Sequence, residues 1–192
     1  IRNAVPGAGF TLPFTSTIAT NQLTGKVGLN YHLSRDGLLY VSASKGYKAG
    51  GVNLTPNTPI FNPERNFVYE AGFKSQFLDR HLRVNGDVFY SVYKDIQLSS
   101  LVGGLPVTQN ALGGHAKGAE LEVTGQFGGL GLNVGAGLLD ASFSNAACIS
   151  DTNAAGTDVG CATNLRRVPE GRNLPFSPKL TLNAGIQYAI PV

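Results

Sequence analysis

Six stretches of the chain alternate apolar and polar residues, and the apolar half of each stretch contains no charged residue. In residues 67–78, the alternate positions that begin at Phe67 hold Phe, Tyr, Ala, Phe, Ser and Phe, whereas Glu70 and Lys74 lie at positions between them. Successive side chains of a β-strand point to opposite faces, so each stretch predicts a strand with one apolar and one polar face. Strands of this length can cross a hydrocarbon layer at a tilt.

The alternation predicts seven strands, of which the second is the least regular because Lys45 falls on its apolar face. Their predicted ranges are 23–33, 38–48, 67–78, 81–98, 117–127, 130–143 and 179–190. The connections between them are alternately short, at 34–37, 79–80 and 128–129, and long, at 49–66, 99–116 and 144–178. Short turns at one end and long loops at the other are typical of outer-membrane barrels. The sequence therefore predicts an all-β fold, an antiparallel up-and-down transmembrane β-barrel.

The number of strands predicts that this chain is one part of a larger barrel. A sheet in hydrocarbon must close, because each unpaired backbone group there costs several kcal/mol. Seven strands, an odd number with wide polar faces, would not close well alone. The chain also begins at Ile1 without an initiator Met or a signal segment, and it ends at Val192 directly after a predicted strand. We therefore expect a fragment.

Composition narrows the class of protein. Charged residues make up 14% of the chain, well below the share in an ordinary soluble domain, and the net charge of +3 is too small to indicate a nucleic-acid partner. No stretch approaches the run of apolar residues that a transmembrane helix needs, whereas membrane strands escape that test because their hydrophobicity alternates.

The polar halves of the strands contain eight charged residues that we expect to line the barrel lumen. They are Lys26, Glu70, Lys74, Arg83, Asp87, Glu120, Glu122 and Lys179. The hairpin register places Lys74 diagonal to Asp87, within reach of an ion pair. Glu120 and Glu122 form a candidate carboxylate pair, but no nucleophile accompanies them, so a polar wall is favoured over catalysis. We expect no enzyme activity, no cofactor and no catalytic, cofactor-binding or metal-binding residue.

Aromatic residues and cysteines supply two further expectations. Four tyrosines fit an aromatic girdle at the membrane interface, and these are Tyr31, Tyr69, Tyr90 and Tyr188. Cys148 and Cys161 lie in the same long loop with no histidine nearby, and a metal site needs more ligands than this pair. A disulfide formed in an oxidising compartment is the favoured interpretation, and two free thiols are the alternative.

Several segments resemble the barrel of TonB-dependent outer-membrane receptors. The resembling segments are residues 23–31, 39–53, 62–65, 69–75, 88–97, 118–122 and 173–179. The resemblance runs in unbroken order over residues 23–190, and it implies a 22-stranded barrel with an N-terminal plug domain. Residues 1–192 would then be part of the barrel domain, without the plug, the TonB box or the C-terminal strands.

The resemblance implies uptake of a scarce nutrient. A ferric siderophore is the favoured ligand, and cobalamin is another candidate. The expected partners are outer-membrane lipid, the TonB complex through the absent N-terminal box, and the small ligand. We expect the protein to be a monomer and to lie in the outer membrane. A passive porin has the same wall without a plug and is the main alternative. A soluble lipocalin-like barrel is disfavoured, because it would bury the lumenal charges and expose the apolar columns to water. The sequence does not identify the ligand.

Overall fold

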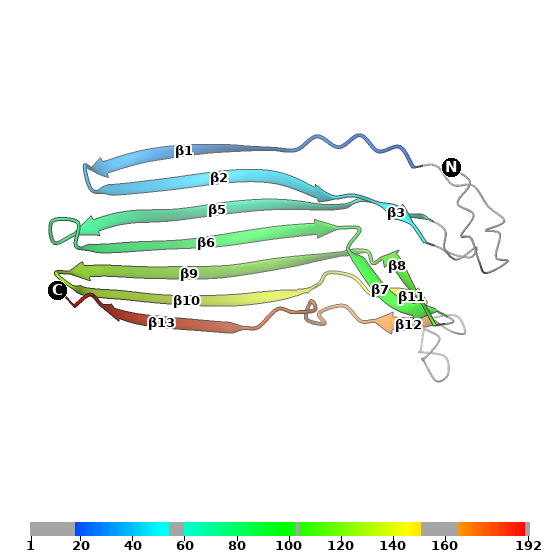
Figure 1. Ribbon diagram of the computed structural model, residues 1–192. Coiled ribbons are helices and arrows are strands. Elements are labelled where there is room, and N and C mark those ends of the chain that lie inside the picture. Colours follow the sequence, from blue (N-terminus) through cyan, green and yellow to red (C-terminus); the bar gives the residue numbers. More distant parts are fainter. Residues whose placement is uncertain (1–17, 54–59, 103, 151–164, 191–192) are drawn as a thin grey trace, which may run out of the picture.

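The computed structural model describes residues 18–53, 60–102, 104–150 and 165–190, and it contains one seven-stranded antiparallel sheet. Each long strand lies beside the next long strand along the chain, which makes the sheet an up-and-down meander (Figure 1). Across the sheet the strands are β1 (Gly25–Ser34), β2 (Gly37–Lys48), β5 (Glu64–Phe77), β6 (Leu82–Lys94), β9 (Gly113–Phe127), β10 (Leu130–Phe143) and β13 (Leu180–Tyr188). The predicted antiparallel all-β fold is confirmed. No helix in the described part of the chain has the length and apolar character to cross a membrane.

The tight turns lie at one end of the sheet, the turn end, and the long connections lie at the other, the loop end (Figure 1). The turn between β5 and β6 is closed by a hydrogen bond from the His81 amide to the Leu78 carbonyl. Its central residues, Asp79 and Arg80, have φ of 52° and 69°. Left-handed residues at both central positions give the turn the twist that adjacent strands require. Phe77, the last residue of β5, pairs with Leu82, the first residue of β6.

Each hairpin is displaced along the strand direction relative to the hairpin before it. Gly37 at the start of β2 lies opposite Ser75, before β5 ends at Phe77. In the same way, Leu82 at the start of β6 lies opposite Gly125, before β9 ends. A stagger that accumulates in one direction is what tilts the strands of a barrel relative to its axis.

The loop-end boundary of the fourth predicted strand is wrong. That strand was expected to run through Leu98, but β6 ends at Lys94 and a new strand, β7, begins at Gln97. Between them Asp95 has a φ of 58°, a left-handed conformation that a continuous strand does not contain. The Asp95 carboxylate accepts a hydrogen bond from Arg65 of β5, and this ion pair holds the bend against the sheet.

The long connections contain three small hairpins that the alternation does not predict. The strand pairs are β3 (Gly51–Val52) with β4 (Ile60–Phe61), β7 (Gln97–Val102) with β8 (Leu105–Asn110), and β11 (Ala147–Ser150) with β12 (Leu165–Val168). The buried hydrophobic residues of the described chain gather beside these hairpins, and the main cluster consists of Ile96, Ala111, Phe143 and Val168. The hydrophobic core therefore lies at the loop end.

Two glycines allow side chains or backbone to approach the sheet closely. Phe73 covers Gly86 as the hairpin register predicts, and a Cβ at Gly86 would lie 2.7 Å from the Phe73 ring. At Gly118 a Cβ would lie 2.5 Å from the Leu138 carbonyl oxygen and 2.6 Å from the Phe89 ring. The backbone oxygen cannot move without disturbing the ladder, so a side chain at this position would destabilise the sheet.

Candidate functional site: the two faces of the wall

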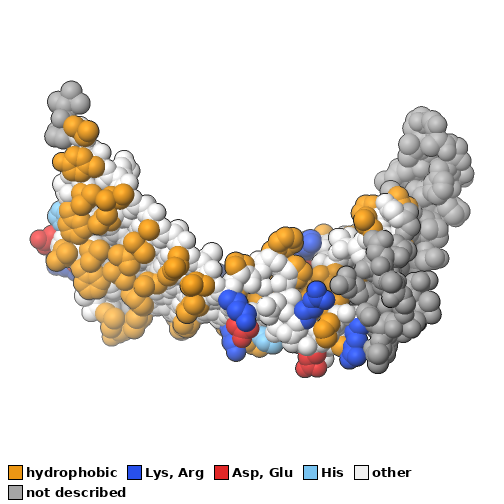
Figure 2. Space-filling view, turned by 90° about the horizontal axis from the view of Figure 1, so that it is seen from below, with side chains coloured by type: hydrophobic (Ala, Val, Ile, Leu, Met, Phe, Trp, Pro, Cys, Tyr) orange, Lys and Arg blue, Asp and Glu red, His pale blue; other side chains and the backbone are white. Residues whose placement is uncertain are grey.

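One face of the sheet, the apolar face, is lined by hydrophobic side chains that the register aligns into rows. Val41 of β2 lies opposite Ala71, which lies opposite Val88 of β6, and the row continues through Ala119 to Leu138. These rows are the predicted charge-free positions, brought side by side. Figure 2 shows the large group of hydrophobic side chains toward the turn end and most of the charged side chains nearer the loop end.

The apolar face has no protein cover in the described structure. Leu29 is 73% exposed, Leu182 is 70% exposed and Ile186 is 77% exposed. Monomeric soluble proteins rarely expose contiguous apolar patches of such extent, because burial of apolar area drives folding in water. Contact with lipid, which is an apolar solvent, removes the free-energy penalty of leaving this apolar area in water.

The opposite face, the polar face, carries the charges predicted to line the lumen. The register places Asp87 directly opposite Glu120, and Glu122 opposite Asn85, whose side-chain amide donates a 3.1 Å hydrogen bond to it. Glu120 and Glu122 lie opposite Gly137 and Gly135 of β10. That this face looks into a lumen stays a prediction, as do the lumenal positions of all eight charges.

The expected ion pair between Lys74 and Asp87 is absent. The salt bridges among the described residues join Arg65 to Asp95, Arg80 to Asp36 and Lys117 to Asp140, and none of them contains one of the eight predicted wall charges. The Lys74 ammonium instead lies 5.7 Å from the centroid of the Tyr40 ring on the neighbouring strand. Like charges directly across a strand pair repel each other, so water around Asp87 and Glu120 lowers the cost of their proximity.

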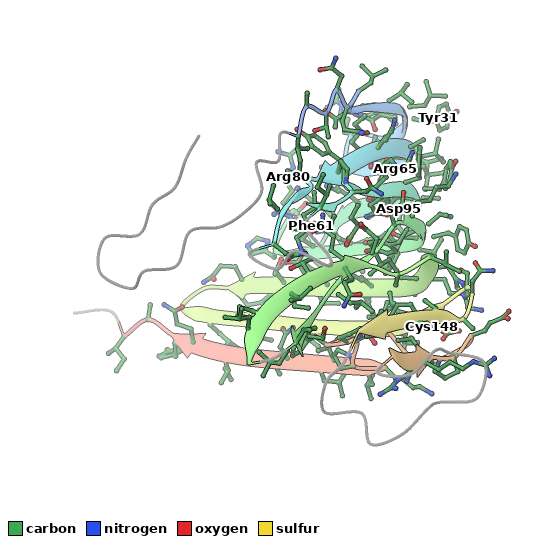
Figure 3. All side chains as sticks on the ribbon, turned by 90° about the vertical axis from the view of Figure 1, so that its right-hand side faces the viewer. Tyr31, Phe61, Arg65, Arg80, Asp95 and Cys148 are labelled. Atoms are coloured by element: carbon green, nitrogen blue, oxygen red, sulfur yellow. The ribbon has the colours of Figure 1, made fainter. Side chains whose placement is uncertain are left out.

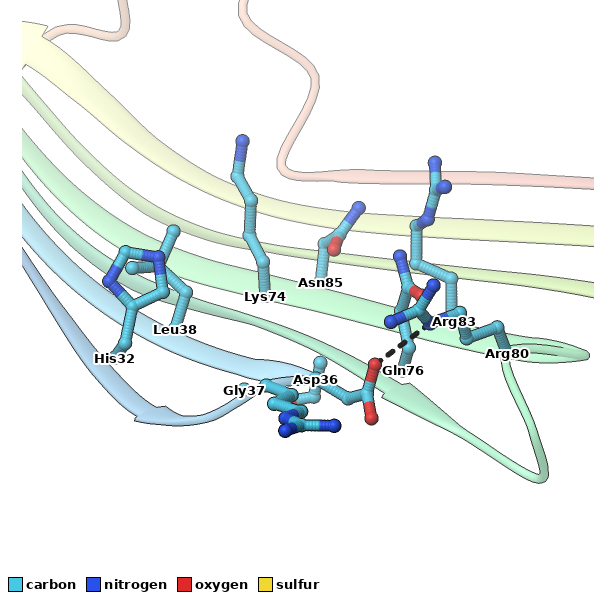
Figure 4. A pocket seen from close by; sticks show the side chains of 11 residues that line it. His32, Asp36, Gly37, Leu38, Lys74, Gln76, Arg80, Arg83 and Asn85 are labelled. Atoms are coloured by element: carbon cyan, nitrogen blue, oxygen red, sulfur yellow. Dashed lines mark hydrogen bonds and ion pairs between the residues drawn. The ribbon is translucent and has the colours of Figure 1, made fainter.

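A cationic cavity lies on the polar face near the turn end, and no sequence motif predicted it. It has a volume of about 410 Å³, and Lys74, Arg80 and Arg83 are among its lining residues. Figure 4 shows Lys74 and Arg83 projecting from the same side of the sheet into this space. Arg80 donates a 2.9 Å hydrogen bond to Asp36, which joins the first two tight turns. The remaining cations of this cavity favour anionic groups there.

Hydrogen bonds between distant loops order the loop end. The Asn53 side chain donates to the Thr108 carbonyl oxygen at 2.8 Å and accepts from the Thr108 amide at 2.9 Å. The Gln97 amide donates to the Glu64 carboxylate at 2.8 Å, which ties β7 to β5. These contacts join residues more than thirty positions apart, so the alternation within single strands could not reveal them.

A second cavity, of about 450 Å³, opens between the β7 hairpin and the β11–β12 hairpin. Its lining is largely apolar, with Leu98, Ile149 and Val168, and Arg172 adds one cation. In Figure 1 these small strands gather beyond the loop end of the sheet. A cavity that combines apolar walls with a few polar groups is the usual form of a small-molecule site. This cavity is therefore the candidate for contact with a ligand.

The predicted tyrosines lie on the apolar face at different heights. Tyr69 and Tyr90 are direct cross-strand partners near its loop end. Tyr31, labelled in Figure 3, is opposite Leu39 nearer the turn end, and Tyr188 pairs with Leu130 beside the last tight turn. All four are exposed. Their role as a girdle at a membrane interface stays a prediction.

The structure describes only one of the two cysteines. Cys148, labelled in Figure 3, lies in β11 and is disulfide-bonded, whereas Cys161 lies outside the described residues. The Cys148–Cys161 pairing stays a prediction. Among the described residues, no group of three or more His, Cys, Asp or Glu side chains could hold a metal ion.

A staggered up-and-down sheet with one apolar face and long loops at one end has the organisation of an outer-membrane barrel wall. The chain belongs to the family of TonB-dependent receptor-like β-barrels, which matches residues 3–191. Membership in this family places the chain in the outer membrane.

Relatives and solved structures agree with this assignment. Over 130 residues the chain is 28% identical to the pesticin receptors of Yersinia enterocolitica and Yersinia pestis, which covers 65% of this chain and 19% of each relative. The ferric yersiniabactin uptake receptor FyuA from Yersinia pestis superposes with a TM-score of 0.66 at 22% identity, over 89% of this chain and 23% of that one. The siderophore receptor PiuA from Acinetobacter baumannii gives 0.63 at 18% identity, over 86% and 23%. The chain thus spans about a fifth of the length of the curated relatives it matches.

Proposed function

We propose that this chain is a wall segment of an outer-membrane receptor that takes up a ferric siderophore by TonB-energised transport. The observation that carries the proposal is the coexistence of an uncovered apolar face with ordered loop hairpins that enclose a cavity at one end of the wall. The family assignment supports a receptor, and solved structures of the same fold include a ferric yersiniabactin uptake receptor and a siderophore receptor.

The proposal gives each part of the wall a role. The apolar face contacts lipid, the eight charges of the polar face line a wet lumen, and the loop hairpins meet the ligand outside the cell. Residues 1–192 supply seven strands from the middle to later part of the barrel, and a plug domain and a TonB box belong to the complete receptor. TonB at the inner membrane then supplies the energy, and the receptor acts as a monomer.

Uptake of radiolabelled ferric siderophore by cells that express the complete receptor tests the proposal. We expect uptake that disappears when the TonB box is deleted or the proton-motive force is collapsed. Uptake that persists after both treatments would identify the passive porin instead. If no ferric siderophore is taken up but cobalamin is, the receptor assignment stands and the cargo assignment fails.

A variant in the loop cavity tests ligand binding separately from energised transport. Arg172→Ala removes the cation of that cavity, whereas Lys179→Ala changes a cation on the wall beyond it. We expect the first variant to weaken ferric siderophore binding to whole cells at low temperature and the second to leave binding unchanged. Equal binding by both variants would remove this cavity from the ligand path.

A further inference from the structure

The apolar face ends, toward the loop end, in a group of cations that the uptake function does not explain. Lys45 of β2 pairs with Phe67 of β5, and Lys94 of β6 pairs with Arg65. Side chains alternate along each strand, so Lys45, Phe67 and Lys94 point to the same face as Tyr69.

Two of these cations share one aromatic ring. The Lys45 ammonium lies 5.5 Å from the centroid of the Phe67 ring, and the Lys94 ammonium lies 5.7 Å from it. Phe67 is half-buried, so its ring is held in the sheet while both lysines lie over it. Attraction between a cation and the face of an aromatic ring holds each ammonium group near the Phe67 ring.

Arg65 and Lys117, the other cations at this end of the apolar face, form salt bridges, whereas Lys45 and Lys94 do not. Arg65 pairs with Asp95, and Lys117 pairs with Asp140 at 3.3 Å. Among the described residues, no carboxylate forms a salt bridge with Lys45 or Lys94. Two like charges that share one ring repel each other, so an anion placed between them would relieve that repulsion.

The place of the two lysines on the apolar face indicates which anion they would bind. Lys45 and Lys94 lie beyond the tyrosine pair Tyr69–Tyr90, on the side away from the apolar rows. Charges on a lipid-facing strand are costly in the middle of the bilayer and much less so at its interface. The lysine stems can lie along the apolar surface while the ammonium groups reach the headgroup layer, where lipid phosphates supply the anions.

We propose that Lys45 and Lys94, positioned by Phe67, bind the phosphate group of a lipid headgroup in the outer leaflet. The proposal requires the apolar face to contact lipid and does not depend on the cargo. The bound lipid is an annular molecule held at one place on the wall, with its chains along the apolar rows and its phosphate between the two ammonium groups.

Native mass spectrometry of the complete receptor in detergent micelles tests this site. The probe is a bis-phosphorylated glycolipid, compared with the same glycolipid after enzymatic removal of its phosphates and with inorganic phosphate. We expect the phosphorylated lipid to be retained and the dephosphorylated lipid to be lost. Each cation near an anionic headgroup contributes about a fivefold factor, so loss of both in the double variant Lys45→Gln, Lys94→Gln should weaken retention roughly 25-fold.

Matched variants control for folding and for charge. The double variant Lys26→Gln, Lys74→Gln removes the same charge from the polar face and should retain the lipid as the unmodified protein does. The double variant Lys45→Arg, Lys94→Arg keeps the cations and should also retain it, with unchanged heat-modifiable mobility as the measure of folding. Equal retention by the Lys45→Gln, Lys94→Gln protein would overturn the proposal, as would displacement of the lipid by inorganic phosphate at millimolar concentration.

Discussion

A single added charge on β10 distinguishes the two faces of the wall. Val134 lies at the centre of the apolar positions of β10, opposite Val123 and Ala184. Its neighbour Asn133 points to the polar face, opposite Thr124 and Gly185. Val134→Lys and Asn133→Lys make the same change of net charge at adjacent residues of one strand, so the face is the main difference between them.

The expected difference is large. A lysine on the lipid face costs about 2–4 kcal/mol at the bilayer midplane, whereas a substitution on a solvated surface usually changes stability by about 0.5 kcal/mol or less. We therefore expect Val134→Lys to lower the free energy of unfolding by about 3 kcal/mol relative to Asn133→Lys, which corresponds to a factor of roughly 150 in the folding equilibrium.

The assay is a guanidinium titration of the complete receptor folded in lipid vesicles, with the folded fraction followed by its electrophoretic mobility without heating. The midpoint should fall clearly for Val134→Lys and stay near the unmodified value for Asn133→Lys. Equal midpoints would refute the assignment of faces. A greater loss for Asn133→Lys would indicate a barrel with an apolar interior, as in a soluble binding protein.

Three further predictions follow from local geometry. Gly118→Ala should destabilise the folded receptor by roughly 1–3 kcal/mol, because the new methyl group meets a backbone oxygen, whereas Gly25→Ala has open space and should leave the denaturation midpoint unchanged. Asn53→Ala leaves a backbone amide and carbonyl of β8 without their partner, so hydrogen exchange in β8 should accelerate while the sheet keeps its protection. Peptide mapping without reduction should recover Cys148 joined to Cys161, and alkylation of Cys161 in unreduced protein would contradict the pairing.

Much of the sheet could be predicted from the sequence because strand alternation is a local property. The hairpin from β5 to β6 is an example: once the tight turn pairs Phe77 with Leu82, every later pair follows, including Tyr69 with Tyr90 and Phe73 with Gly86. The loop end could not be predicted in this way. Its hairpins alternate over too few residues to stand out from irregular loop sequence.

The sequence alone also could not predict how charged side chains pair. Sequence register placed Lys74 within reach of Asp87, and the structure shows the Lys74 ammonium over the Tyr40 ring of the other neighbouring strand. A strand has neighbours on both sides, and a hairpin defines only one of them. The second neighbour of β5 is β2, across a long loop whose length does not determine the register between them.

The sequence by itself determined the seven long strands, their two faces and the alternation of short and long connections, because each depends on residues close together in the chain. The tertiary structure alone decided which residues meet across loops: the small core at the loop end, the cationic cavity near the tight turns, and the two lysines that share the Phe67 ring. Those contacts depend on the register and stagger of strands that are distant in sequence. Local periodicity carries no information about that register.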